Sequence, residues 1–200
     1  MNPSRRVSTF TLASLMVCGV ASAMLLPGTA HAQPDPKVEK AMADLKARTA
    51  KLGAPTLEGK EAVAGKDANA LYFGKTKINN NFEIVDAVVK DYGGTATLFA
   101  KTGNDYIRVS TNVPLPEGKG RATGTILDPK GKAIVNIDKG EPFYGVVTLL
   151  TAEMLMQDSI GYGEPAFGVN IVEEPYITGY EPIKDASGKV IGIYYVGYKK

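Results

Sequence analysis

Residues 175–200, PYITGYEPIKDASGKVIGIYYVGYKK, restrict the fold more than any other part of the sequence. Two runs rich in Tyr, Ile and Val flank the polar stretch KDASGK at residues 184–189, which has a Gly near its end. Runs of aromatic and β-branched residues on both sides of such a turn predict a β-hairpin. The sequence therefore predicts that the chain closes with two neighbouring antiparallel strands.

The beginning of the sequence has the three parts of a secretory signal peptide. Two arginines precede an uncharged, largely apolar run over residues 10–26, and the triplet Ala30-His31-Ala32 follows. This pattern predicts cleavage after Ala32 and export to the periplasm. The alternative is an uncleaved membrane anchor, which the helix-breaking Pro-Gly pair before the triplet disfavours. We therefore expect residues 1–32 to be a signal peptide and the folded protein to follow it.

Cleavage at this point would remove the only cysteine, Cys18, and the only histidine, His31. Without a thiolate or an imidazole, the mature chain could perform neither Ser-His-Asp nor Cys-His catalysis. Zinc sites of the usual nitrogen and sulfur ligands and haem ligation by His or Cys are excluded for the same reason. We therefore expect no enzyme, no cofactor and no metal site.

Charge points to no polyanionic partner. Removing the two arginines of the leader from the 23 basic residues leaves 21, which equals the 21 acidic residues. The sequence contains no basic stripe of the kind that binds nucleic acid and no polybasic run of the kind that binds anionic lipid. We therefore expect no nucleic-acid partner.

Residues 35–52 predict an amphipathic helix, with Asp35 as its N-cap, Pro36 in its first turn and Gly53 at its end. The helix packs either on a second protomer, giving a homodimer through the N-terminal helix, or on its own sheet. Residues 54–70 are rich in Gly, Ala and Lys and predict a loop or a short irregular crossover. The apolar stripe of the helix consists of Val38, Met42, Leu45, Thr49 and Leu52.

The remaining sequence predicts a second helix and a series of strands. Asn81 can cap the helix, and a hairpin is predicted for residues 95–113 around Gly103-Asn104-Asp105. A short helical piece near residues 133–138 precedes the strand-like FYGVVTLL. This order predicts an α+β domain with one antiparallel sheet of about five strands. The buried face of the second helix is expected to consist of Ile84, Val85, Val88 and Val89.

Several stretches, in the order in which they occur, resemble the Cache domains, which are PAS-like extracytoplasmic sensing modules of bacterial chemoreceptors and histidine kinases. The similarity is to the single Cache module of the Cache 3/Cache 2 fusion type. It implies a PAS-like fold in which residues 33–70 form an N-terminal helix and linker and residues 71–200 form the Cache domain. The stretches are NNNFEIVDAVVKDYGGTATLF, YIRVSTNV, RATGTILD, EPFYGVV, PYITGYEPI and VIGIYYVGY.

Two features depart from the family pattern. The final strand of these receptor domains normally feeds a transmembrane helix, whereas this sequence ends at Lys200, so we expect a stand-alone secreted protein. The family joins its GVV-like strand to its PYIT-like strand by a short link, whereas residues 151–174 form a longer segment here. That segment is either a lid or an extension of the fold.

Alternation along the predicted strands assigns side chains to the two faces of the sheet. Tyr106, Arg108, Ser110 and Asn112 would share one face. The resemblance implies that helices pack on one face of the sheet and that a ligand is enclosed on the other. Arg108 is the best candidate to bind a ligand carboxylate, because its guanidinium donates two parallel hydrogen bonds. The other candidate ligand-binding residues are Arg121, Thr123, Tyr144, Tyr176, Thr178 and Tyr180.

Each candidate also has a structural alternative. Arg108 is either a ligand anchor or a solvated strand residue, and Arg121 either completes the anion site or belongs to a mobile loop. The tyrosines either line a ligand site or pack on the sheet.

The resemblance predicts a soluble periplasmic sensor domain for a small molecule, an organic acid or an amino acid. Its occupancy would be read by a membrane-bound receptor or histidine kinase. The alternative is a ligand-free protein-interaction module of the same fold. An open cavity with convergent polar groups beside Arg108 favours the sensor, and a closed, apolar-filled space favours the module.

Overall fold

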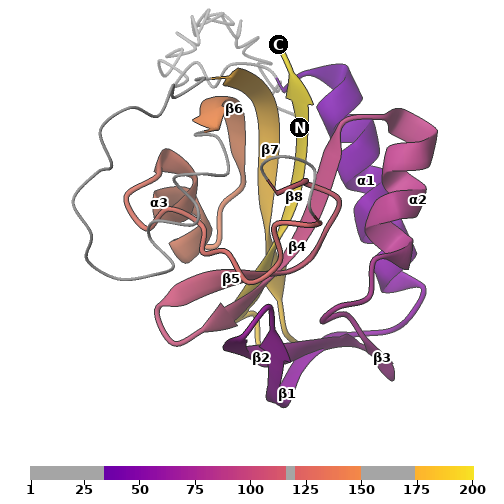
Figure 1. Ribbon diagram of the computed structural model, residues 1–200, viewed down its shortest axis with the longest axis vertical. Coiled ribbons are helices and arrows are strands. Elements are labelled where there is room, and N and C mark those ends of the chain that lie inside the picture. The colour runs from indigo at the N-terminus through magenta and orange to yellow at the C-terminus, as the bar shows by residue number, and fades with distance from the viewer. Residues whose placement is uncertain (1–33, 116–119, 150–173) are drawn as a thin grey trace, which may run out of the picture. The chain divides into compact units, whose positions relative to one another are not determined.

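The computed structural model of the protein describes residues 34–115, 120–149 and 174–200. The structure contains three helices and two antiparallel sheets (Figure 1). In chain order the elements are α1 (Pro36–Ala50), β1 (Pro55–Val63), β2 (Lys66–Phe73), β3 (Thr76–Lys77), α2 (Glu83–Tyr92), β4 (Thr95–Thr102), β5 (Asp105–Thr111), α3 (Lys132–Asp138), β6 (Phe143–Leu149), β7 (Glu174–Lys184) and β8 (Val190–Lys199).

The larger sheet has five strands in the order β5-β4-β8-β7-β6, and every neighbouring pair is antiparallel. This confirms the predicted α+β fold with a central antiparallel sheet of about five strands. The hairpins predicted from the polar turns are formed by β4 with β5 and by β7 with β8. The short helix predicted near residues 133–138 is α3.

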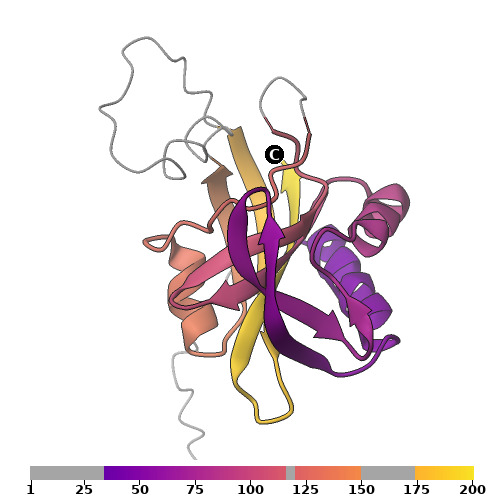
Figure 2. The ribbon, with the colours of Figure 1, turned by 60° about the horizontal axis from the view of Figure 1, so that its bottom comes forward.

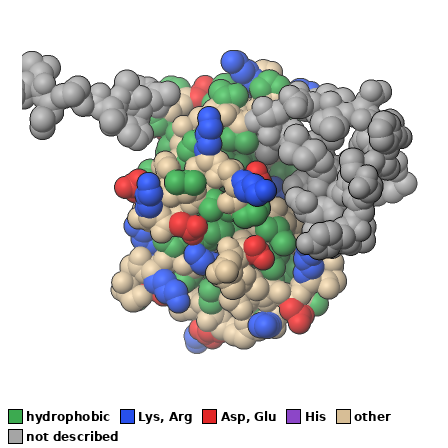
Figure 3. Space-filling model, turned by 90° about the vertical axis from the view of Figure 1, so that its left-hand side faces the viewer, with side chains coloured by type: hydrophobic (Ala, Val, Ile, Leu, Met, Phe, Trp, Pro, Cys, Tyr) green, Lys and Arg blue, Asp and Glu red, His purple; other side chains and the backbone are tan. Residues whose placement is uncertain are grey.

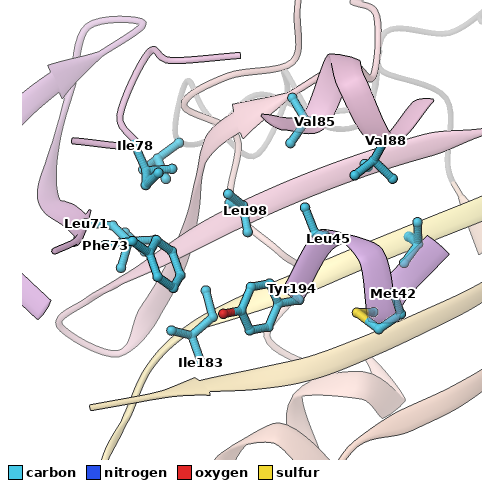
Figure 4. Packing of buried hydrophobic residues seen from close by; sticks show 14 of the residues in the cluster. Met42, Leu45, Leu71, Phe73, Ile78, Val85, Val88, Leu98, Ile183 and Tyr194 are labelled. Atoms are coloured by element: carbon cyan, nitrogen blue, oxygen red, sulfur yellow. The ribbon is translucent and has the colours of Figure 1, made fainter. Parts of the chain in front are cut away.

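Local capping explains where α1 begins. The side chain of Asp35 accepts a 2.8 Å hydrogen bond from the backbone N–H of Lys37, and Pro36 occupies the first turn. Four of the five residues of the predicted apolar stripe are buried, whereas Leu52 is 37% exposed beyond the end of the helix. The N-terminal helix therefore packs on its own sheet, as Figure 4 shows for Met42 and Leu45 beside Tyr194 of β8.

The second helix, α2, also follows its local signals. The Asn81 side chain accepts a 3.1 Å hydrogen bond from the Glu83 backbone N–H, although Phe82 occupies the cap position itself. Val85 and Val88 are fully buried, and the helix ends at Tyr92 with Gly93 as its C-cap. The predicted buried face is confirmed, because Ile84 and Val89 also pack against the same core.

The prediction of a loop over residues 54–70 is wrong, because this stretch forms most of a second sheet, in the order β1-β2-β3. The turn between β1 and β2 is made by Ala64 and Gly65, with φ angles of 48° and 81°. Positive φ at both positions is the geometry of a tight two-residue hairpin turn, whose first position normally holds Asn, Asp or Gly. Ala in that position gives no sequence indication of a hairpin. The apolar side chains of β2, including Leu71 and Phe73, join the main core.

The five-stranded sheet has two faces with different coverings. Helices α1 and α2 cover one face and enclose the main hydrophobic core with β4, β5 and β8 (Figures 1 and 4). Helix α3 packs on the opposite face (Figures 1 and 2). A second and smaller hydrophobic cluster lies there. This second cluster contains Phe99, Tyr106, Ala133, Ile134, Ile137, Tyr180, Ile193 and Tyr195.

A β-bulge in β5 changes the predicted faces of that strand. Leu98 of β4 pairs with Ser110, but the next residue, Phe99, pairs with Arg108, so one extra residue lies in β5. Ser110 consequently turns toward α2, where its hydroxyl donates a hydrogen bond to the Asn81 carbonyl. Thr111 takes the place predicted for Ser110, because it contacts Thr97 at 2.7 Å between hydroxyl oxygens. The prediction that Ser110 shares a face with Arg108 is wrong.

Several sequence predictions fall outside the described residues. These are the signal peptide with its cleavage after Ala32, and all of the longer segment 151–174 except Glu174, which begins β7. Within the described residues, no helix combines the length and the apolar character that crossing a bilayer requires.

Candidate functional site

Arg108 is the most unusual polar residue of the α3 side of the sheet. Only 6% of its surface is exposed, and its guanidinium carbon lies 5.1 Å from the centre of the Phe99 ring. Nη1 donates a 2.7 Å hydrogen bond to the Thr125 hydroxyl, whereas Nε has no partner among the described residues. Burial lowers the pKa of Arg108, and the nearby hydroxyls of Tyr195 and Tyr180 oppose that change.

The charge of this guanidinium is not balanced within the described part of the chain. None of the ion pairs formed by the described residues includes Arg108. A buried cation normally has an acidic partner and a full set of hydrogen bonds. Arg108 therefore presents a desolvated positive charge and a free donor on the same side chain, which is an arrangement suited to an anion.

Two buried tyrosines lie beside Arg108. The rings of Tyr180 and Tyr195 have centroids 4.8 Å apart, and Phe143 packs 6.1 Å from the Tyr180 ring. Burial raises the pKa of both tyrosines, that of Tyr195 to about 12. Both hydroxyls are therefore neutral near pH 7. The Tyr195 hydroxyl lies 3.2 Å from Thr95 Oγ1 and donates to it, because Thr95 donates its own proton to the Gly197 carbonyl. Of the two tyrosines, Tyr180 is therefore the one that can donate a hydrogen bond to an anion.

Helix α3 lies over this face and is attached at its C-terminal end. Asp138 accepts hydrogen bonds from the Tyr106 hydroxyl at 2.8 Å and from Lys101 Nζ at 3.1 Å. Burial by itself would raise the pKa of Asp138, but these two hydrogen bonds outweigh it and hold the pKa below its ordinary value. On the inner side of the helix, Ile134 and Ile137 pack into the second cluster. The surface on this side carries acidic and basic side chains in a mixture (Figure 3).

Arg121 has a different environment from Arg108. Its two terminal nitrogens contact the two carboxylate oxygens of Asp86 on α2, at 2.6 and 2.9 Å. It also donates to the Thr111 carbonyl at 2.9 Å and lies 4.4 Å from the centre of the Phe82 ring. The structure therefore joins Arg121 to the helix α2 and does not bring it to Arg108.

Tyr144 lies on the other face of the sheet. Its hydroxyl donates a hydrogen bond to Glu181, which also forms an ion pair with Lys46 of α1. Its ring approaches Gly179, as does Val38 of α1. The strand alternation that directs Phe143 toward Tyr180 directs Tyr144 toward α1. Tyr144 is therefore separated from Arg108 by the sheet.

The three remaining candidates are Tyr176, Thr178 and Thr123. Tyr176 and Thr178 share the face of Tyr180, and Tyr176 is close enough to Tyr195 to affect its titration. The Thr178 hydroxyl donates to the Gly145 carbonyl at 3.0 Å. Thr123 is half-buried, and its hydroxyl donates to the Arg121 carbonyl at 3.4 Å.

Sequence reasoning missed Thr125 and Tyr195. Tyr195 could have been found, because VIGIYYVGY alternates and Tyr195 directly pairs with Tyr180 in the closing hairpin. Thr125 gave no such indication, because it lies in an irregular segment that runs beside β5. Among the described residues, no three Cys, His, Asp or Glu side chains gather as metal ligands would.

Comparison with protein families agrees with this arrangement. The model of the Cache 3/Cache 2 fusion domain matches residues 28–157, and the model of single cache domain 3 matches residues 148–200. The chain belongs to the Cache family. No curated protein matches the sequence.

Membership in the Cache family supports a general sensor role for this protein. Cache domains are extracytoplasmic sensor domains rather than enzymes, and they generally bind small molecules and work with receptors or kinases. The α+β fold with an N-terminal helix and a central antiparallel sheet is the PAS-like Cache fold. The Cache domain described here carries Arg108 on the face of the sheet opposite α1 and α2.

Proposed function

We propose that this Cache domain senses a small carboxylate, an organic acid or an amino acid, whose carboxylate binds Arg108. The observation that carries the proposal is the buried guanidinium, for which the described residues provide neither a partner for Nε nor an acid that balances the charge. Tyr180 would add a neutral hydroxyl beside the carboxylate, the Tyr195 ring packs against Tyr180, and Tyr176 lies farther along the same face. The proposed site therefore excludes Arg121 and Tyr144, which have other partners.

The energetic argument rests on desolvation. The cost of burying the guanidinium is already included in the folded state, so an incoming carboxylate gains a strong interaction without desolvating the cation anew. Hydrogen bonds to charged groups contribute about 1.5–3 kcal/mol, more than neutral ones. A neutral analogue of the same ligand would lose most of that contribution.

Isothermal titration calorimetry tests this function. The purified protein is titrated with a panel of organic acids and amino acids, and each binder is then compared with its neutral amide. We expect at least one carboxylate to bind and its amide to bind at least about tenfold more weakly. A broad panel without a binder would remove the support for a sensor of carboxylates.

The proposal includes a signalling partner in the periplasm. Occupancy of the site would change how the domain meets a membrane-bound receptor or histidine kinase, since ligands act by favouring one of two states. Crosslinking of the protein in cells, with and without the identified ligand, would show whether a membrane partner is contacted in a ligand-dependent way.

One observation favours the ligand-free interaction module as a second candidate. Ile134 and Ile137 of α3 fill part of the face around Arg108 with apolar side chains. In that function Arg108 would be a structural residue, held by Phe99 and Thr125. The calorimetric panel separates the two candidates, because the module would bind no carboxylate.

A further inference from the structure

The nitrogens of the Arg108 guanidinium differ in the hydrogen-bond partners that the described residues provide. A guanidinium can meet a carboxylate end-on, through its two terminal nitrogens, or side-on, through Nε and Nη2. Nη1 already donates to Thr125 Oγ1, and Nε is the donor without a partner among the described residues. The buried donor without a partner therefore lies on the side-on edge, which Nε shares with Nη2.

The Thr125 hydroxyl can only be the acceptor in its contact with Arg108. A hydroxyl has one proton, and that of Thr125 is donated to the Ala122 carbonyl at 2.8 Å. Its lone pairs then face Nη1 of Arg108 at 2.7 Å. Thr125 is itself 5% exposed, so water does not readily replace this contact.

The backbone fixes Thr125 to the same strand residue. The Arg108 N–H donates to the Thr125 carbonyl at 2.9 Å, and the Gly124 N–H donates to the Arg108 carbonyl at 2.8 Å. The side chains of Arg108 and Thr125 are thus held together by main-chain and side-chain hydrogen bonds. On the other side, the Phe99 ring limits the plane of the guanidinium.

We propose that Thr125 is a positioning residue, which orients Arg108 so that its Nε–Nη2 edge receives the two oxygens of the ligand carboxylate. This inference rests on the proposed function and adds the binding mode and the residue that sets it. Without the Thr125 oxygen, Nη1 would lose its buried acceptor. The guanidinium would then no longer be held in one orientation for the carboxylate. This positioning role requires the hydroxyl of Thr125 but not its methyl group.

The test uses Thr125→Val, which removes the oxygen with little change of shape, and Thr125→Ser as the matched control, which retains it. The probes are acetate and its neutral analogue acetamide. The readout is the ¹H–¹⁵Nε resonance of Arg108, assigned by its loss in Arg108→Lys. We expect acetate, but not acetamide, to shift this resonance in the wild type and in Thr125→Ser. In Thr125→Val the apparent Kd for acetate should rise at least about tenfold, as expected for one hydrogen bond at a charged group.

The results distinguish a failure of the proposed carboxylate sensing from a failure of the positioning role of Thr125. If no carboxylate in the panel binds, both are overturned. If a carboxylate binds and Arg108→Ala abolishes its binding, but the Nε resonance does not move or Thr125→Val binds like the wild type, only the positioning role is overturned. A Thr125→Ser variant that binds as weakly as Thr125→Val also overturns it, because the retained hydroxyl would then be irrelevant. Near-ultraviolet circular dichroism of the tyrosines shows whether each variant keeps the native packing.

Discussion

At the scale of single residues, Arg108 and Arg121 show that the partners of an arginine determine its role. Arg121 has a carboxylate, a carbonyl and an aromatic ring as partners. Among the described residues, Arg108 has one aromatic ring and one hydroxyl as partners, and it is much more deeply buried. Arg121 is therefore satisfied by the protein itself, whereas Arg108 has capacity left for an additional anion.

Removing the Arg108 side chain tests its role as an anchor. Arg108→Ala should weaken binding of the carboxylate identified by calorimetry on the order of 10- to 100-fold, because a hydrogen-bonded charge is lost. Arg108→Lys should also bind more weakly, since an ammonium lacks the two-pronged geometry. Arg121→Ala is the matched control, with the same loss of charge at a guanidinium already paired with Asp86. Equal titrations of wild type and Arg108→Ala would show that the ligand binds elsewhere.

Arg108 should also reduce the stability of the ligand-free protein. Replacing it by Met, an apolar side chain of similar length, removes the desolvation penalty of an unbalanced charge. We expect Arg108→Met to raise the free energy of unfolding in urea by about 1 kcal/mol or more in buffer without carboxylates. A lower free energy of unfolding in this variant would identify Arg108 as part of the stabilising structure and argue for the interaction module.

At the scale of elements, α3 is the helix that covers the candidate site. Two of its isoleucines pack onto the sheet, and Asp138 joins its end to the β4–β5 hairpin through Lys101 and Tyr106. The helix has only 7 residues, too few to be stable by its own hydrogen bonds. Its position therefore depends on these contacts.

The Asp138 contacts give α3 a pH dependence. Because the folded state holds the pKa of Asp138 below its ordinary value of 3.8, the stabilisation is present above that pH. It is lost as the pH falls through the folded-state pKa. Asp138→Asn should reduce the free energy of unfolding at pH 7 by about 0.2–1 kcal/mol, a value typical of partly exposed pairs, and the difference should shrink as the pH falls below 3.8.

Hydrogen exchange provides the local measurement for this variant. Amides of α3 should exchange faster in Asp138→Asn than in the wild type at pH 7. Glu141→Gln is the control, since it removes a neighbouring exposed carboxylate. Equal exchange of α3 in Asp138→Asn and the wild type would mean that the isoleucines alone hold the helix.

At the scale of the whole domain, the five-stranded sheet separates stability from the proposed binding. The larger core lies with α1 and α2 on one face, and Arg108 lies on the other. A ligand on the Arg108 face can therefore gain or lose contacts without disturbing the larger core. Binding to the folded state alone must also stabilise it, through mass action.

Ligand binding should therefore raise the melting temperature of the wild type. At a ligand concentration 100 times Kd, the free energy of unfolding should increase by about 2.7 kcal/mol. In Arg108→Ala, the same ligand concentration should give a clearly smaller increase, in proportion to the weaker affinity. Differential scanning calorimetry over a ligand series measures both. A ligand-dependent increase that is identical in the two proteins would contradict binding at Arg108.

Local interactions made much of this fold predictable. Asp35 and Asn81 bind backbone N–H groups within two residues of themselves, and the polar turns of the two large hairpins join strands that are adjacent in sequence. Such features depend on neighbouring residues only, so the sequence contains the full information for them. The antiparallel sheet and the N-terminal helix followed from these elements, whereas the resemblance to Cache domains rested on six short sequence stretches in order.

Only the tertiary structure decided which side chains meet at the site. The extra residue in β5 moved Ser110 to the other face, the pairing of β6 with β7 directed Tyr144 toward α1, and an irregular segment brought Thr125 to Arg108. A bulge reverses the alternation of every later residue in its strand, and neither a bulge nor a pairing register is encoded in the period of two. The sequence alone thus determined the helices, the strands of the larger sheet and the family, whereas long-range packing decided that Arg108 is buried without an acidic partner among the described residues.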